Sequence, residues 1–311
     1  MKILFLHYII LIIPLLISIA YLTLAERKIL GYTQNRKGPN VVGIYGLFQP
    51  LSDGVKLFSK EIILPNHVNL LFFLFSPIIA LTLALFIFTL LPFEKSTVIL
   101  NTNYTLLFFF AISALSVFVL LLSGWSSNSK YAFLGALRAA AQMISYEISI
   151  GLIVMTIVMI CSSFNIININ TTQSHSTWLL LPLFPMGILF FVSCLAETNR
   201  APFDLTEGES EIVSGFNVEY SSMSFALFFL AEYAHIIFMS FLMVHLFLGG
   251  YPFLFVKSTF IIFFFIWVRT SFPRLRYDQL MHLLWKSYLP LSLSFIFITN
   301  TILWLSFGLH Y

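Results

Sequence analysis

Carboxylates gather in one stretch of an otherwise apolar chain, at residues 197–219. This stretch holds six of the thirteen acidic residues, and the sequence on either side of it is rich in Leu, Phe and Ile. They are Glu197, Asp204, Glu207, Glu209, Glu211 and Glu219. Carboxylates are costly to keep near lipid, so they mark a pathway or a site by default. The chemistry that such groups can perform is the uptake and release of protons.

Two of these acids, Glu207 and Glu211, are four residues apart and would be neighbours on a helix. Two like charges at that distance disfavour joint ionisation, so one carboxyl can keep its proton. The alternative is a solvated acidic loop. Apolar residues such as Phe203 and Phe216 are interleaved with the acids, and they argue against simple solvation.

Two further carboxylates, Glu147 and Glu232, lie inside apolar runs that are long enough to be membrane helices. A charge at the centre of such a helix costs about 2.5–3.5 kcal/mol, so both side chains should face protein or water. A carboxyl group that burial makes easier to protonate is a suitable proton carrier. The alternative is a structural ion pair, for example between Glu147 and Arg138.

The composition places these acids in a membrane protein. The 311 residues are 59% hydrophobic and only 9% charged, whereas soluble domains are about 25% charged. A spanning helix needs roughly 20 mainly apolar residues, and the runs are continuously apolar, which excludes a barrel of alternating strands. We therefore predict an all-α polytopic membrane protein with a single domain, 1–311. It has about eight spans, near 3–25, 68–92, 103–123, 135–161, 177–196, 220–248, 253–271 and 287–307.

The basic residues orient these spans. Thirteen of the sixteen Lys and Arg residues fall beside the loops after spans 1, 3, 5 and 7, and the other three are Lys2, Lys95 and Lys257. The positive-inside rule then puts those loops inside and both termini outside. The long inside loops follow spans 1 and 5, and the first is rich in Gly, Pro and Gln.

The other residue types that often carry chemistry give no cofactor site. Cys161 and Cys194 lie in apolar runs without metal-ligand spacing, which is typical of core residues. His235 and His245 are ten residues apart on one predicted helix and face different sides, so we expect no haem. Dinucleotide, phosphate-loop and CxxC motifs are missing. We expect no flavin, haem, iron–sulfur cluster or metal in this chain, and no nucleic-acid partner.

Several motifs together resemble one known family. They read AERKILGY from residue 25, RKGPN from residue 36, GALRAAAQ from residue 135, ETNRAPFD from residue 197, AEY from residue 231 and PRLRYDQL from residue 273. In this order they are similar to subunit 1 of NADH:ubiquinone oxidoreductase, respiratory complex I. The resemblance covers about residues 20–287.

The resemblance implies a membrane subunit that forms the ubiquinone channel and couples quinone reduction to proton translocation. It implies quinone-channel roles for Arg27, Arg36, Asp53, Phe229, Tyr233 and Arg269. It implies a proton-relay or coupling role for Glu147, Glu197, Asp204, Glu207, Glu209, Glu211, Glu232 and Asp278. Ubiquinone is then a bound substrate.

The same resemblance implies partners and a place in the cell. The partners are the iron–sulfur and quinone-head-binding subunits of the peripheral arm, the antiporter-like membrane subunits, and membrane lipids. The place is the mitochondrial inner membrane with both termini toward the intermembrane space, or alternatively a bacterial cytoplasmic membrane.

Two competing functions are a hydrogenase or antiporter subunit without quinone and a passive anchor for the peripheral arm. The basic, Gly-rich first loop argues against the former, and the intramembrane Glu147 and Glu232 argue against the latter.

Overall fold

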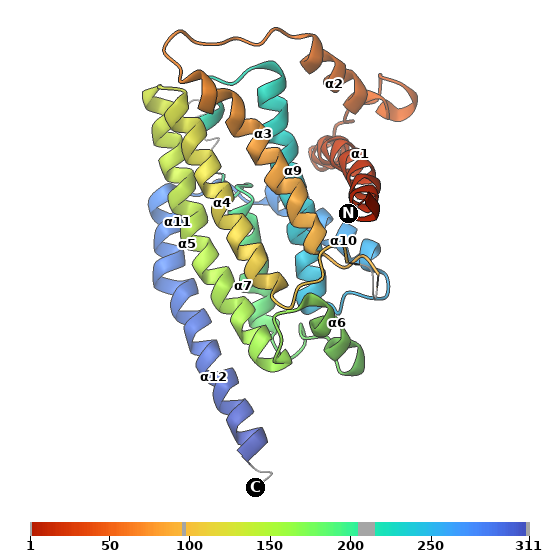
Figure 1. Ribbon diagram of the computed structural model, residues 1–311, viewed down its shortest axis with the longest axis vertical. Helices are drawn as coiled ribbons and strands as arrows, with labels where there is room; N and C mark the ends of the chain where they lie inside the picture. The colour runs from red at the N-terminus through yellow and green to blue at the C-terminus, as the bar shows by residue number, and fades with distance from the viewer. Residues whose placement is uncertain (1, 95–97, 205–214, 309–311) are drawn as a thin grey trace.

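The computed structural model describes residues 2–94, 98–204 and 215–308, and these residues form helices and connections without a strand (Figure 1). The prediction of an all-α polytopic membrane protein is therefore confirmed. The helices are α1 Lys2–Thr33, α2 Gln49–Ser59, α3 Leu70–Phe86, α4 Thr105–Ser126, α5 Lys130–Cys161, α6 Ile166–His175, α7 Phe184–Glu197, α9 Ser222–Phe247, α10 Leu254–Ser271, α11 Tyr277–Leu283 and α12 Leu289–Gly308. Short helical turns are η1 Ile44–Gly46, η2 Ile87–Leu90, η3 Gly215–Asn217 and η4 Leu284–Tyr288.

Within the described residues, seven helical segments are long and apolar enough to cross a membrane, rather than eight. The prediction of a span at 177–196 was wrong in length, because α7 has only 14 residues. At about 1.5 Å per residue it is roughly 21 Å long, which is shorter than the ~30 Å hydrocarbon core of a bilayer.

The cause of the short α7 lies at its two ends. Pro185 occupies its first turn, where a missing N–H is tolerated. At the other end, Asn199 adopts a left-handed backbone conformation with φ of 50°, which a helix cannot continue through. Residues 198–204 therefore form a turn, and Glu197 is buried in the bundle rather than exposed on its inside face.

Three other helices extend beyond their predicted bounds. α1 ends at Thr33 rather than 25, α5 begins at Lys130 rather than 135, and the last helical segment begins at Tyr277 rather than 287. The extension of α1 matters most, because it carries the charged sequence Glu26-Arg27-Lys28 on a helix instead of in a loop.

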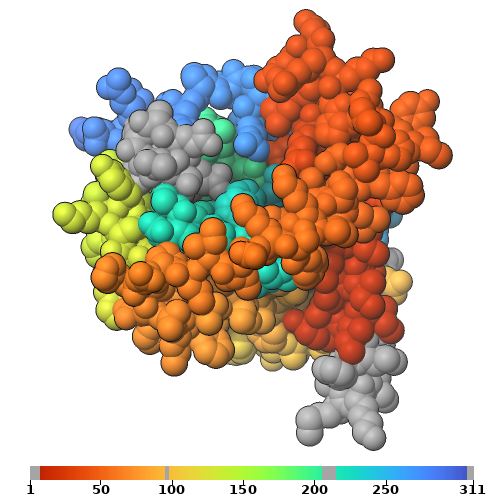
Figure 2. All heavy atoms as spheres, turned by 90° about the horizontal axis from the view of Figure 1, so that it is seen from above, coloured from red at the N-terminus to blue at the C-terminus, as the bar shows by residue number. Residues whose placement is uncertain are grey.

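The core of the molecule is a bundle in which α3, α4, α5 and α9 lie side by side, with α12 along α5 (Figure 1). α1 lies at the edge of this bundle, against α9 and α10. The long connection after α1, which contains α2, lies at one end of the molecule, and Figure 2 shows it spread over that end. Ser222 at the start of α9 ties this connection down by donating a 2.7 Å hydrogen bond to the carbonyl of Lys60.

The turn at 198–204 is clamped to α5 by Gln142. Its amide nitrogen donates hydrogen bonds of 2.8 Å to the carbonyl oxygens of Ala196 and Phe203, at the two ends of the turn. Gln142 is fully buried, so these bonds form in a low dielectric, where an unmade bond is costly. The clamp fixes the position of every functional side chain that the turn carries.

The chain returns to α5 at η3. A Cβ atom on Gly135 of α5 would lie only 2.7 Å from the Cα atom of Gly215. The absence of a side chain at Gly135 therefore allows η3 to pack directly on α5.

Candidate functional site

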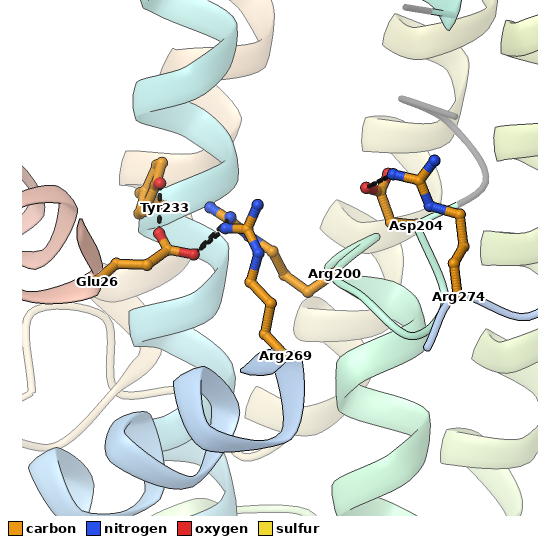
Figure 3. Close-up of polar contacts among 6 residues, drawn as sticks. All are labelled: Glu26, Arg200, Asp204, Tyr233, Arg269 and Arg274. Atoms are coloured by element: carbon orange, nitrogen blue, oxygen red, sulfur yellow. Dashed lines mark hydrogen bonds and ion pairs between the residues drawn. The ribbon is translucent and has the colours of Figure 1, made fainter. Parts of the chain in front are cut away.

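Three other segments of the chain converge on the carboxylate of Glu26 in α1 (Figure 3). The Tyr233 hydroxyl of α9 donates a 2.5 Å hydrogen bond to Glu26 Oε2. Arg200, from the turn after α7, donates to Glu26 Oε1 at 3.1 Å. Arg269, near the end of α10, forms an ion pair with the same oxygen. We call Glu26, Arg200, Tyr233 and Arg269 the Glu26 cluster.

The sequence of α1 explains why Glu26 points inward. Leu15, Ile19 and Leu22 are buried and recur at helical spacing, and Glu26 continues the same stripe four residues after Leu22. The stripe faces α9 and α10, so the carboxylate enters the protein where the apolar side chains end.

Arg200 is the buried cation of the cluster. Its guanidinium lies over the ring of Tyr233, 4.3 Å from the ring centre, in a cation–π contact. Burial lowers the pKa of Arg200, but Glu26 and then Tyr233 and Glu232 raise it by more, so the group stays charged. The cluster contains two guanidinium groups and one carboxylate, and its net charge is positive.

A pocket opens beside the Glu26 cluster, between α1, α9 and α10. All four cluster residues line it, and the rest of its wall is apolar. The apolar lining residues are Leu22, Ile236, Ile262, Phe265 and Ile266. A pocket with apolar walls and a few converging polar groups suits a ligand that is mostly apolar and carries a small polar head. We call it the Glu26 pocket.

The residues predicted for a quinone channel are only partly brought together. Tyr233 and Arg269 line the Glu26 pocket, and Phe229 is one helical turn from Tyr233 on the same face of α9. The ring of Phe229 packs against that of Phe225 in a tilted arrangement, with 4.3 Å between ring centres. The other three lie elsewhere. Arg27 forms an exposed 2.7 Å ion pair with Asp53 of α2, and Arg36 is exposed in the connection after α1.

A second cavity lies on another side of α9, and we call it the Glu197 cavity. Glu197, Thr198 and Asn199 of the turn form one wall. Glu232 and His235 of α9 lie on another, and apolar side chains of α3, α4 and α5 close the space between. The predicted relay residues Glu197 and Glu232 therefore share one cavity.

Glu147 of α5 belongs to the same region. It accepts a 2.8 Å hydrogen bond from Ser113 of α4, and it is close enough to Glu197 for the two charges to interact. The structural alternative, an ion pair with Arg138, does not fit the helix, because nine residues of α5 separate the two side chains and turn them to opposite faces.

The remaining predicted acids are distributed differently. Asp204 is buried and pairs with Arg274 at 2.8 Å (Figure 3). Asp278 is exposed in the first turn of α11. Glu207, Glu209 and Glu211 lie outside the described residues.

Two residues of the site were missed by the sequence reasoning, Glu26 and Arg200. The prediction ended the first span at residue 25 and thereby moved Glu26 into a loop. The signal that could have found it is the Leu15, Ile19, Leu22 spacing, which continues to Glu26 on a longer helix. No comparable signal pointed to Arg200, since its position depends on a turn that the sequence did not predict.

Cys161 and Cys194 are buried and free, as predicted for core residues. Over residues 2–94, 98–204 and 215–308, no group of three or more His, Cys, Asp or Glu side chains could hold a metal ion.

Comparisons with known proteins find the same family along almost the whole chain. The family model described as NADH dehydrogenase matches residues 6–300. NADH-ubiquinone oxidoreductase chain 1 of Metridium senile is 59% identical, over 98% of this chain and 94% of its own length. The same-named protein of Chondrus crispus is 52% identical, over 96% and 95%. A bacterial relative, an NADH-quinone oxidoreductase protein of Rhodospirillum rubrum, is 51% identical, over 93% and 90%.

The Glu26 cluster predicts a large difference between two similar substitutions. Glu26→Gln leaves Arg200 buried without its counter-charge, and breaking a buried pair costs on the order of 3 kcal/mol or more. Asp53→Asn breaks the exposed pair with Arg27, which costs at most about 1 kcal/mol. Thermal unfolding of the purified protein in detergent should therefore show a much lower transition temperature for Glu26→Gln. Equal shifts for the two variants would contradict the structural role of the cluster.

Proposed function

Because this chain belongs to the NADH dehydrogenase family, as a membrane subunit of NADH-ubiquinone oxidoreductase, we propose that it forms the channel through which ubiquinone reaches the site of its reduction. The observation that carries this proposal is the Glu26 pocket, an apolar space between α1, α9 and α10 with a positively charged cluster in its wall.

The chemistry of the pocket matches the two parts of a ubiquinone. The isoprenoid tail is apolar and gains free energy from contact with side chains such as Ile236 and Phe265. The head group carries carbonyl oxygens, which accept hydrogen bonds. Arg269 lines the pocket and carries N–H donors beyond the one that binds Glu26, and Glu26 holds both Arg269 and Tyr233 in place. Phe229 extends an aromatic surface along the same face of α9.

The proposal includes coupling of quinone chemistry to proton movement. Reduction of a quinone takes up two electrons and two protons, so negative charge develops in a site of low dielectric. Charges there act strongly on nearby titratable groups. The Glu197 cavity and Glu147 supply carboxylates that can bind or release protons when this negative charge appears.

One short turn connects the two places. Glu197, Thr198 and Asn199 line the Glu197 cavity, and the next residue, Arg200, reaches into the Glu26 cluster. α9 also connects the two places, because Glu232 lines the Glu197 cavity and its neighbour Tyr233 lines the Glu26 pocket. A change of charge in the Glu26 pocket therefore alters the electrostatic potential at Glu197 and Glu232, which are only a few residues away from the pocket along the chain.

The partners and place in the cell follow from the family. A membrane subunit of NADH-ubiquinone oxidoreductase works in an inner or plasma membrane with other subunits of that enzyme. We propose contacts with the iron–sulfur and quinone-head-binding subunits on one side and with antiporter-like subunits on the other, with both termini outside. The iron–sulfur chemistry is then supplied by neighbours, and ubiquinone is the substrate that this chain binds.

The channel proposal is tested by photo-crosslinking. The intact oxidoreductase is irradiated with a ubiquinone analogue that carries a photoreactive tail, and the labelled peptides are mapped. We expect label on the α1, α9 and α10 peptides around Leu22, Tyr233 and Phe265, and loss of that label when excess unlabelled ubiquinone competes. Label confined to other subunits would contradict the channel.

The coupling proposal is tested by Glu147→Gln, with Glu94→Gln as the matched control. Glu94 is exposed in the connection after η2 and does not line the cavity. Loss of the proton-binding group at Glu147 should lower proton pumping in vesicles by about tenfold or more, within the usual size of a proton-transfer effect, while the complex still assembles. The control should pump normally. Normal pumping by assembled Glu147→Gln would exclude its relay role.

A further inference from the structure

The Glu197 cavity contains one proton-binding side chain that the proposed relay does not use, His235. On α9 the lining residues Phe228, Ala231, Glu232, His235 and Met239 follow helical spacing and form one face. Glu232 and His235 are three residues apart on that face, so they are neighbours along the cavity wall.

The part of the lining that comes from the end of α7 and the turn after it presents acceptors without partners. Among the described residues, Glu197 Oε2 and Asn199 Oδ1 are shielded from solvent and have no hydrogen-bond partner. Glu197 itself is only 8% exposed. Buried acceptors of this kind are normally satisfied by a protein group or by an internal water. Both atoms belong to residues that line the cavity.

The cavity has room for water. The space that the centres of water molecules can occupy is about 50 Å³, and about 10–15 Å³ of such space is enough for one water molecule. Water in this space can bridge Glu197 and Asn199 on one wall to Glu232 and His235 on the other. Apolar side chains such as Val119 and Leu120 form the rest of the lining and offer this water no competing hydrogen-bond partner.

His235 is suited to pass protons along this water. In neutral imidazole one ring nitrogen carries a hydrogen and the other accepts one. His235 supplies the imidazole of the lining, within the part of the chain that the structure describes, and its two ring nitrogens allow it to take up a proton at one nitrogen while it releases one from the other.

We propose that His235 carries protons between Glu232 and Glu197 through water in the Glu197 cavity. In one transfer the protonated Glu232 carboxyl gives its proton to the free ring nitrogen of His235. The hydrogen on the other ring nitrogen then leaves to water and ends on the Glu197 carboxylate. One O–H bond breaks and one forms, and the imidazole is neutral before and after. Rotation of the ring resets it for the next proton. This step rests on the proposed coupling function.

The plain alternative is a core histidine that only fills space beside Met239. The two roles predict that different substitutions of His235 preserve function. A space-filling role is satisfied by a side chain of similar size, whereas a relay role requires a base that can exchange protons at neutral pH.

The test uses His235→Ala in the intact oxidoreductase, reconstituted in vesicles, with NADH oxidation and proton pumping measured together. Both should fall about tenfold or more, in line with loss of a proton-transfer group. Added imidazole should restore them in proportion to its concentration. Thiazole has a similar shape and is far less basic, so it should not restore them. Imidazole should not change the turnover of Met239→Ala, which opens space on the same wall without removing a base.

Two results would overturn the proposal. One is normal pumping by His235→Ala. The other is a loss that His235→Gln repairs or that imidazole does not. Glu197→Gln and Glu232→Gln, measured in the same vesicles, separate this proposal from the one it rests on. Normal pumping by both would sink the relay as a whole, whereas loss of pumping in both with normal His235→Ala would sink the role of His235 alone.

Discussion

The buried carboxylate of Glu26 is the interaction on which the arrangement of the site depends. It joins α1 to the turn after α7, to α9 and to α10, and its two arginine partners are 174 and 243 residues away in the chain. Only 17% of the apolar part of α1 is buried. Apolar surface gives little drive for helix association in lipid, so packing and polar contacts must hold such a helix. Glu26 supplies the polar contact, and the pocket beside it exists because α1 is held there.

A second constraint on the site is the turn at 198–204. It follows α7, which is too short to be the full membrane span that the sequence predicted. Because α7 stops at Glu197, polar groups enter the bundle instead of its surface. Gln142 satisfies the backbone of the turn at both ends, so a non-helical segment is tolerated inside the protein. The turn then places Glu197 in one cavity and Arg200 in the other. The shorter helix is thus what brings the Glu197 cavity and the Glu26 pocket within a few residues of each other.

Much of the fold could be predicted from the sequence, because continuous apolar runs allow few alternatives in a membrane. Glu147, Glu197 and Glu232 could be selected because they are carboxylates within or beside these apolar runs. The structure brings all three to one region. Glu26 was missed because the charged triplet that begins with it was interpreted as the end of a helix, although α1 continues to Thr33, seven residues beyond Glu26. The pairing of Glu26 with Arg200 and Arg269 depends on contacts between distant segments, which local sequence patterns do not encode. The same is true of the short α7, whose end is set by one left-handed residue, Asn199.

We propose that ubiquinone passes between α1, α9 and α10 beside the Glu26 cluster. The most direct measurement is an experimental structure of the intact oxidoreductase with a ubiquinone analogue that carries a bromine atom on its tail. We expect analogue density in the Glu26 pocket, with a carbonyl oxygen of the head group within hydrogen-bond distance of Arg269. Density for the analogue on the other side of α9, in the Glu197 cavity, or only against other subunits, would contradict it.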